Sequence, residues 1–159
     1  MLKDIQIAIA DIKDAKEIVE VSYQVAKMHD EAVPEYFKPI PKEEEMRNIC
    51  EMFKDGRVTV FKAVKEGKIC GFLFLEMIHR QSKGLAFSKL GNILNLGVDE
   101  ACRGKGIGTE LIEAAEDFIR QQGGEAIDMC VFAFNKKAIK LYERLGYKTI
   151  DLSMRKVLK

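Results

Sequence analysis

Apolar residues recur along the chain with two spacings, one typical of strands and one typical of helices. Alternating or β-branched apolar runs predict strands, whereas apolar residues that return every three or four positions predict helices. The predicted strands are Ile5–Ile9, Arg57–Val64, Lys68–Ile78, Ile93–Val98, Ala126–Phe134 and Tyr147–Leu158. The predicted helices span residues 14–28, 43–53, 107–122 and 135–145.

This order of elements, β-α-α-β-β-β-α-β-α-β, predicts an α/β (α+β) fold with a mixed, mostly antiparallel sheet. The short link Lys65–Gly67 favours a hairpin between the strands that flank it. The helix between Ile93–Val98 and Ala126–Phe134 is a crossover connection, which makes those two strands parallel. A length of 159 residues without a linker indicates one domain, residues 1–159.

The charge of the chain is nearly balanced, with 26 basic and 25 acidic side chains and a net charge of +1. This balance argues against a protein that binds nucleic acid through a broadly basic face. No apolar run approaches the roughly 18 residues that a membrane helix needs. The sequence therefore predicts a soluble, cytoplasmic protein without a membrane partner.

The four cysteines are far apart and form no C-x-x-C pair, so the sequence predicts no metal site. Cys50, Cys70 and Cys130 are expected as reduced thiols in the core. Cys102 stands close to a predicted helix start, where the pKa of a thiol can fall, and its role stays open.

A glycine-rich turn joins the strand that ends at Val98 to the next predicted helix. Its sequence is Arg103-Gly104-Lys105-Gly106-Ile107-Gly108-Thr109, with glycines at three alternate positions. Glycines let neighbouring N–H groups converge, and the first helical turn adds unpaired donors and the positive end of the helix dipole. The turn is therefore a candidate cradle for a di- or triphosphate, with the Lys105 ammonium and the Thr109 hydroxyl as further donors.

Other interpretations of this turn are less compatible with its spacing. A Walker loop needs Gly-Lys-Ser or Gly-Lys-Thr, and neither occurs in the chain. A dinucleotide fingerprint needs G-x-G-x-x-G in an early βαβ unit, whereas this turn is G-x-G-x-G and lies two-thirds of the way along the chain. A purely structural turn needs one glycine rather than three.

Two groups of residues resemble motifs of the GNAT superfamily of N-acetyltransferases. The first is R-x-x-G-x-G at Arg103, Gly106 and Gly108, between an apolar strand and a long amphipathic helix. The second is N-x-x-A-x-x-L-Y-x-x-x-G-[FY], whose residues here are Asn135, Ala138, Leu141, Tyr142, Gly146 and Tyr147. The resemblance implies a GNAT-like fold, in which the two parallel strands splay apart and acyl-CoA enters the gap.

The resemblance also implies acetyl-CoA as the acetyl donor, with CoA as a product. The pyrophosphate is then expected on the glycine-rich turn, and the pantetheine arm and acetyl carbonyl along the backbone of Leu96–Val98. Asn95 is a candidate for a bulge in that strand. The cofactor-binding residues implied are Leu96, Gly97, Val98, Arg103, Gly104, Lys105, Gly106, Ile107, Gly108, Thr109, Asn135, Ala138 and Tyr142.

The family pattern makes Tyr142 the general acid that protonates the CoA sulfur. A phenol with an ordinary pKa of about 10 can donate its proton to a departing thiolate at neutral pH. The general base is not defined, because Asn92 stands where some family members carry a glutamate. Glu76 and His79, late in the preceding strand, are candidates, and a route through solvent is equally compatible.

The acceptor is expected to contact the connection between the first two helices, because such connections carry specificity on a fixed scaffold. His29, Glu31 and Tyr36 offer an acid and aromatic rings that suit a cationic amine. The resulting prediction is an acetyl-CoA-dependent N-acetyltransferase that acts by direct attack of a small-molecule primary amine. A peptide or protein amine is an alternative acceptor. A non-catalytic acyl-CoA-binding or sensing domain and a nucleotide-binding module are alternative functions, and the resemblance admits a homodimer.

Overall fold

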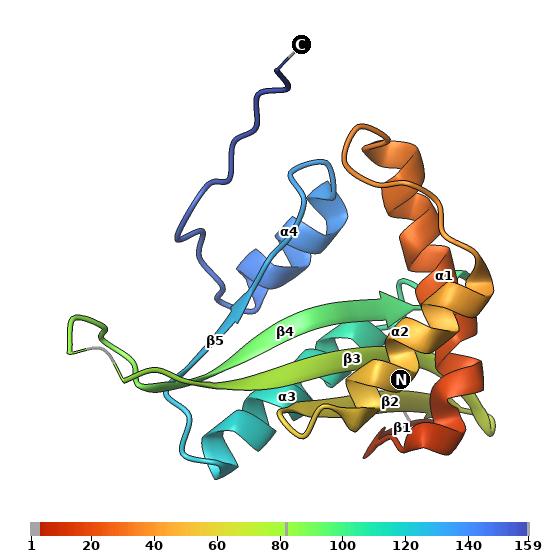
Figure 1. Cartoon of the computed structure of the whole chain (residues 1–159). Helices are drawn as coiled ribbons and strands as arrows, with labels where there is room; N and C mark the ends of the chain where they lie inside the picture. The colour runs from red at the N-terminus through yellow and green to blue at the C-terminus, as the bar shows by residue number, and fades with distance from the viewer. Residues whose placement is uncertain (1–3, 82, 159) are drawn as a thin grey trace.

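Five strands form one mixed sheet in the order in which they occur along the chain (Figure 1). The computed structural model describes residues 4–81 and 83–158. Its strands are β1 (Ile5–Ile9), β2 (Val58–Lys65), β3 (Lys68–His79), β4 (Lys89–Val98) and β5 (Ala126–Met129). Its helices are α1 (Ala15–Ala32), α2 (Lys42–Lys54), α3 (Ile107–Gln121) and α4 (Lys136–Arg144), with short 3-10 turns at Ile12–Asp14 and Glu100–Cys102.

The pairing of the strands agrees with the predicted mixture of directions. β1 to β4 pair antiparallel, and β5 pairs parallel to β4 after the crossover through α3. The hairpin between β2 and β3 turns on Glu66 and Gly67, whose φ angles are 51° and 76°. Two successive positive φ angles match the right-handed twist of the flanking strands, which is why a two-residue link is sufficient here.

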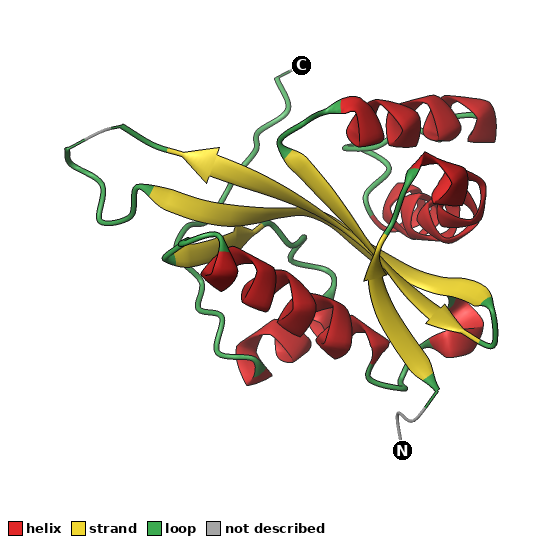
Figure 2. Cartoon of the chain, turned by 90° about the horizontal axis from the view of Figure 1, so that it is seen from below, coloured by secondary structure: helices red, strands yellow, loops and turns green. Residues whose placement is uncertain are grey.

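Alternation within the central strands divides the core into two layers. Val60, Phe72 and Phe74 pack with α1 and α2, whereas Phe61 and Leu73 pack with α3. Figure 2 shows the helices on the two sides of the twisted sheet, with α1 and α2 on one face and α3 and α4 on the other. The sheet is thus covered on both faces, and the separation of β4 from β5 lies between the two helical layers.

The predicted last strand, Tyr147–Leu158, is not formed, and this prediction is wrong. The segment leaves α4 and runs away from the sheet instead of along β5 (Figure 1). Its apolar side chains are largely exposed, for example Ile150 at 79% and Met154 at 93%. An alternating pattern produces a strand only when a neighbouring edge supplies hydrogen bonds and apolar cover, and the path of the chain after α4 brings neither.

The strand predicted over Ala126–Phe134 is also shorter than expected, because it ends at Met129. Cys130 therefore lies beyond the sheet and is exposed, which corrects its expected place in the core. Cys70 is buried, and burial raises the pKa of its thiol. Cys50 and Cys102 are partly buried.

Within residues 4–81 and 83–158, no helix is long and apolar enough to cross a membrane.

Candidate functional site

The parallel pair β4 and β5 separates partway along β4. Their ladder joins residues 90–93 to Ala126–Met129 and stops there, whereas β4 continues to pair with β3 through Val98. The register jumps from Phe74↔Asn95 to Leu75↔Ile93, so Leu94 is the extra residue of a β-bulge. Beyond Ile93, the edge of β4 that faces β5 is open. The bulge lies next to Asn95, and the splay is the one that the family resemblance implies.

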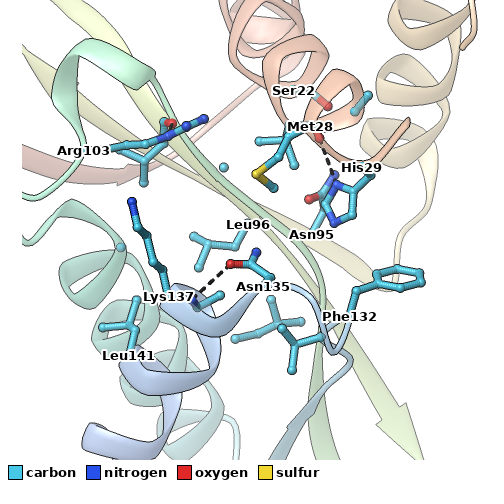
Figure 3. Close-up of a pocket in the computed structure, with 18 of the residues that line it drawn as sticks. Ser22, Met28, His29, Asn95, Leu96, Arg103, Phe132, Asn135, Lys137 and Leu141 are labelled. Carbon is cyan, nitrogen blue, oxygen red and sulfur yellow. Dashed lines mark hydrogen bonds between the residues drawn. The ribbon is translucent and has the colours of Figure 1, made fainter. Parts of the chain in front are cut away.

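A cavity of about 950 Å³ occupies the space beside this open edge (Figure 3). Its walls come from α1 and the connection after it, from the glycine-rich turn, and from α4 with the segment that precedes it. Gly97 lets α1 approach β4, because a Cβ there would lie 2.4 Å from Phe72 Cε1 and 3.0 Å from Val25 Cγ2. Gln24 fixes this approach through 3.0 Å hydrogen bonds with the Asp99 carboxylate and the backbone N–H of Glu100.

The glycine-rich turn has a backbone that requires glycine at two positions. Gly104 and Gly106 have φ angles of 75° and 79°, in the left-handed region that glycine enters without strain. Gly106 is the N-cap of α3. The first N–H groups of α3 therefore have no carbonyl partner within the helix, and they form an end at which an anion can bind.

All of the predicted cofactor residues except Lys105 line the cavity. The Lys105 ammonium instead donates a hydrogen bond to the Ala101 carbonyl at 2.8 Å. Arg103 Nε donates to the Val98 carbonyl at 3.0 Å, which holds the arginine between the end of β4 and the turn. Gly108 lies where α3 meets α4, since a Cβ there would be 3.4 Å from Leu141 Cδ2.

Asn135 begins α4 at the edge of the cavity. Its side-chain carbonyl accepts a hydrogen bond from the Ala138 N–H at 3.1 Å, which is an N-cap interaction (Figure 3). The cap uses the oxygen of the amide, so its nitrogen remains a donor for a bound molecule. Asn135 can therefore fix the start of α4 and contact a ligand at the same time.

Tyr142 lies on α4 and faces the same cavity. Burial raises the pKa of its phenol, so the group stays protonated through neutral pH and remains able to donate a proton. The neighbouring Tyr147, with ring centroids 6.1 Å apart, donates its hydroxyl to Glu116 at 3.1 Å. Tyr147 is bound to α3 through this contact, whereas Tyr142 is the tyrosine on α4 that lines the cavity.

Aromatic side chains gather on the side of the cavity away from the glycine-rich turn (Figure 3). We call His29, Tyr36, Phe37, Phe132 and Phe134 the aromatic cluster. Its rings meet edge-on or tilted, with centroids 4.8 to 6.2 Å apart. His29, Phe37 and Phe132 line the cavity, whereas Tyr36 is 49% exposed and carries the Arg155 guanidinium 4.0 Å above its ring.

Of the three residues expected to bind the acceptor, Glu31 lies outside this arrangement. Its carboxylate is 68% exposed and lies 3.9 Å from the Lys27 ammonium. The sequence did not single out Phe132 or Phe134, because their apolar run was interpreted as a buried strand. The pattern gave no sign that β5 would end at Met129, which places Phe132 on the wall of the cavity and Phe134 against the His29 ring.

Glu76 and His79, the two candidates for the general base, lie away from the cavity. Glu76 is opposite Asn92 on β3, and its carboxylate is 3.1 Å from the Arg57 guanidinium. His79 is the last residue of β3, opposite Lys89. Neither is among the described residues that line the cavity. Their assignment as the base has no support from this placement.

Glu45 is an acidic residue of the cavity that sequence reasoning did not assign to the site. It lies in the first turn of α2, and its carboxylate accepts a hydrogen bond from the buried Ser22 hydroxyl of α1. Both residues line the cavity. In the described part of the chain, no group of three His, Cys, Asp or Glu side chains is arranged to hold a metal ion.

Comparison of this sequence with models of protein families identifies one family. Residues 25–147 match the sequence model of the Acetyltransferase (GNAT) family. The N-acetyltransferase YdgE of Bacillus subtilis is 32% identical over 95 residues, which are 58% of this chain and 56% of YdgE. A mycothiol acetyltransferase of Propionibacterium freudenreichii is 38% identical over 61 residues, 38% of this chain and 20% of that protein. Each match therefore covers less than two-thirds of the relative.

Solved structures have the same fold. BH1408 of Bacillus halodurans has a TM-score of 0.89 at 24% identity, over 96% of this chain and 99% of that chain. An aminoglycoside N-acetyltransferase, AAC(6')-Iy, in complex with CoA has a TM-score of 0.77 at 15% identity, over 98% and 95% of the two chains. At these identities the likeness extends to the fold, so the chemistry of the site depends on the residues of this chain.

Proposed function

Because the chain belongs to the GNAT family of acetyltransferases, we propose that it transfers the acetyl group of acetyl-CoA to a primary amine by direct attack. One observation carries the proposal: the open edge of β4, the glycine-rich turn and Tyr142 all line one cavity. Acyl transfer needs a binding site for the donor, fixed backbone dipoles and a proton source, and these three features supply them.

The residues present fit acetyl-CoA as the donor. Left-handed glycines at the start of α3 make the anion cradle that a pyrophosphate requires, with the Arg103 guanidinium beside it. The open edge of β4 from Leu94 to Val98 offers main-chain groups that no β5 residue pairs with. An extended pantetheine arm can bind such an edge as an added strand does.

Two groups of the chain then act on the reacting atoms. Main-chain donors of the bulged part of β4 are held rigidly by the ladder with β3, and a fixed donor to an oxyanion lowers the barrier by about 3 kcal/mol. Tyr142 gives its proton to the departing sulfur. Its burial favours the neutral phenol, which keeps the proton available until the thiolate forms.

The acceptor in this proposal is a small-molecule amine that enters beside the aromatic cluster. AAC(6')-Iy, whose fold is shared, is an aminoglycoside acetyltransferase, which is consistent with small amines as acceptors in this fold. A peptide or protein amine is the alternative acceptor. A non-catalytic acyl-CoA sensor is the alternative function, and the placement of Tyr142 in the cavity favours catalysis over it.

We also propose that the chain assembles as a homodimer through its C-terminal segment, Tyr147–Leu158. Its exposed apolar side chains are Ile150, Leu152, Met154, Val157 and Leu158. In the described chain β5 pairs with β4 alone, so its outer edge is available for a strand. Light scattering should give twice the mass of one chain. A single-chain mass at high concentration would overturn this part of the proposal.

Binding and turnover test the proposed function separately. Thermal unfolding is measured with acetyl-CoA, CoA, ATP or NAD, each at about 100 times an assumed micromolar dissociation constant, where a ligand adds about 2.7 kcal/mol and raises the midpoint by several degrees. We expect the shift with acetyl-CoA and CoA only. Release of free CoA thiol in the presence of amines then distinguishes an enzyme from a sensor, which would bind without turnover.

A further inference from the structure

We infer that the acceptor is a primary amine carried on an aromatic or apolar group, and that the Nε2 atom of His29 removes a proton from its nitrogen. The inference rests on the proposed acetyl transfer and specifies its substrate class and its base. The observations that carry it are the apolar lining beside β4, the balance of charge around the cavity, and the hydrogen bond that fixes the His29 ring.

The acceptor side of the cavity is lined mainly by hydrocarbon. Three rings of the aromatic cluster line it, and apolar side chains of the two splayed segments join them. Leu94, the bulged residue of β4, is 42% exposed, and Val131 on the opposite segment is 37% exposed. Apolar side chains held open in a concave site are the usual sign of an apolar ligand, because burial of their surface stabilises the complex.

The charged side chains are divided between the two sides of the cavity, and those on the acceptor side suit one positive group better than several. The cationic side chains along its described wall are Lys38, Arg103, Lys137 and Arg144, and the anionic ones are Asp30 and Glu45. Arg103 in the glycine-rich turn and Lys137 and Arg144 on α4 suit the phosphates of the donor. On the side of α1 and α2 the charges are Lys38, Asp30 and Glu45, which sum to −1, and a single ammonium matches that charge and can also be held by the faces of aromatic rings.

The His29 ring has one nitrogen that is committed and one that is free to accept a proton. Nδ1 lies 2.9 Å from the carbonyl of Val25, one turn earlier in α1. A carbonyl only accepts hydrogen bonds, so Nδ1 carries the hydrogen and the lone pair of the neutral ring is on Nε2. Figure 3 shows the ring turned into the cavity, toward the side on which Leu96 and Asn135 lie.

The position of α1 brings this nitrogen near the open edge of β4. Val25 packs over Gly97, and His29 is four residues, or about 6 Å, further along the helix. Phe37, Phe132 and Phe134 surround the imidazole edge-on at centroid distances of 5.5, 5.5 and 5.6 Å. These rings hold its orientation and offer Nε2 no hydrogen-bond donor, so an amine that enters the cluster can become its partner.

The acceptor R–NH3⁺ gives one proton to His29 Nε2, and the resulting R–NH2 attacks the thioester carbon. A C–N bond forms, the C–S bond breaks, and Tyr142 gives its proton to the sulfur. The nitrogen loses a second proton, which restores the phenol of Tyr142. The products are R–NH–CO–CH3, CoA thiol and one proton, which passes from His29 to solvent.

The first experiment compares acceptors at fixed, saturating acetyl-CoA. The probes are 2-phenylethylamine, n-hexylamine, ethanolamine, spermidine and kanamycin, with released thiol as the readout. We expect kcat/KM for 2-phenylethylamine and hexylamine to exceed that for ethanolamine at least about 30-fold, since burial of several methylenes or a ring is worth at least about 2 kcal/mol. Preference for spermidine or kanamycin would overturn the substrate class while leaving the proposed acetyl transfer intact.

The second experiment uses His29→Asn, whose amide nitrogen can keep the bond to the Val25 carbonyl while Nε2 is removed. At pH 7 we expect kcat to fall about 100-fold or more, as for loss of a general base. The ratio of wild-type to variant kcat should shrink as the pH approaches about 10, where an alkyl amine loses its own proton. A loss that is constant with pH would mean a packing role and would overturn the assignment.

Other titrating groups near the ring do not confuse this test. Asp30 on α1, Lys38 in the connection after it, Glu45 on α2 and Lys137 on α4 face the same cavity. They are present in both proteins, so their titration cancels in the ratio. The comparison variant is His79→Asn, which changes the other histidine of the chain. A larger loss of kcat in His79→Asn than in His29→Asn would indicate His79 as the base and overturn the inference.

Discussion

The two sides of the cavity are built in different ways. The proposed donor side is built mainly from backbone, namely left-handed glycines, the start of α3 and the open edge of β4, which lie in one continuous stretch of sequence, and Asn135 and Tyr142 join it from α4 and its N-cap. The acceptor side is made of side chains that come from α1, the connection after it and the segment after β5. Backbone geometry binds a constant ligand and leaves little to vary, whereas a cluster of side chains can be changed ring by ring. The proposed site would therefore bind a constant donor through backbone and an acceptor through side chains that can vary.

The largest effect should come from the donor side. Gly106→Glu places a carboxylate and a Cβ at a φ angle of 79°, where the pyrophosphate should bind, and we expect no measurable acetyl-CoA binding by calorimetry. Gly67→Glu is the matched control, because Gly67 has a φ of 76° with open space around it in the β2–β3 hairpin. Equal loss of binding in both variants would point to misfolding rather than to the cradle.

Removal of the Tyr142 hydroxyl should separate chemistry from binding. We expect Tyr142→Phe to lower kcat about 100- to 10,000-fold, the usual range for a general acid, with acetyl-CoA affinity changed less than about threefold. Tyr147→Phe is the control, because that hydroxyl is committed to Glu116 and Tyr147 lies just beyond the C-terminal end of α4. If Tyr142→Phe kept its turnover, another group would have to protonate the sulfur.

A single ring of the aromatic cluster tests the acceptor side. Phe132→Ala removes a ring that contacts His29, Tyr36 and Phe37, and we expect the KM for 2-phenylethylamine to rise about 10- to 100-fold, from a loss of about 1.5 to 3 kcal/mol. Acetyl-CoA affinity should stay constant. Weaker acetyl-CoA binding with an unchanged acceptor KM would reverse the assignment of the two sides.

The smallest effect concerns stability at alkaline pH. Burial raises the pKa of Tyr142, and burial together with the Glu116 carboxylate raises the pKa of Tyr147. The unfolded phenols lose their protons near pH 10, before the folded ones, so the free energy of unfolding should fall as the pH rises above about 10. Urea midpoints measured between about pH 8 and 11 should show this fall, and Tyr147→Phe should reduce its slope. An unchanged slope in that variant would exclude Tyr147 as its source.

The sequence predicted the geometry of the glycine-rich turn because the residues that determine it are contiguous. Three alternating glycines between a strand and an amphipathic helix have few backbone solutions, and Asn135 is the N-cap that its position before a helix predicts. The directions of the strands were also predictable, because short hairpins make neighbouring strands antiparallel and one helical crossover makes β4 and β5 parallel. Lys105 was expected as a further donor to the ligand, but its ammonium donates a hydrogen bond to the Ala101 carbonyl instead. The sequence pattern does not encode this side-chain contact.

The acceptor side could not be predicted in the same way. Phe132 and Phe134 alternate as in a buried strand, and nothing local marks the departure of the chain from the sheet after Met129. Ile150 and Met154 alternate too, yet they are exposed, because a strand also needs an edge to join. The hydrogen bond from Ser22 to Glu45 joins residues 23 positions apart, a contact that no local pattern encodes.

The Arg155 guanidinium 4.0 Å above the Tyr36 ring gives the molecule a place for an optical reporter. The chain contains no tryptophan, so Tyr36→Trp would introduce a single indole beside the aromatic cluster. The fluorescence emission of that indole would change when a ligand displaced the stacked guanidinium or excluded water from the neighbouring rings. Acceptors could then be found by titrating amines against the fluorescence of the enzyme, without acetyl-CoA and without turnover.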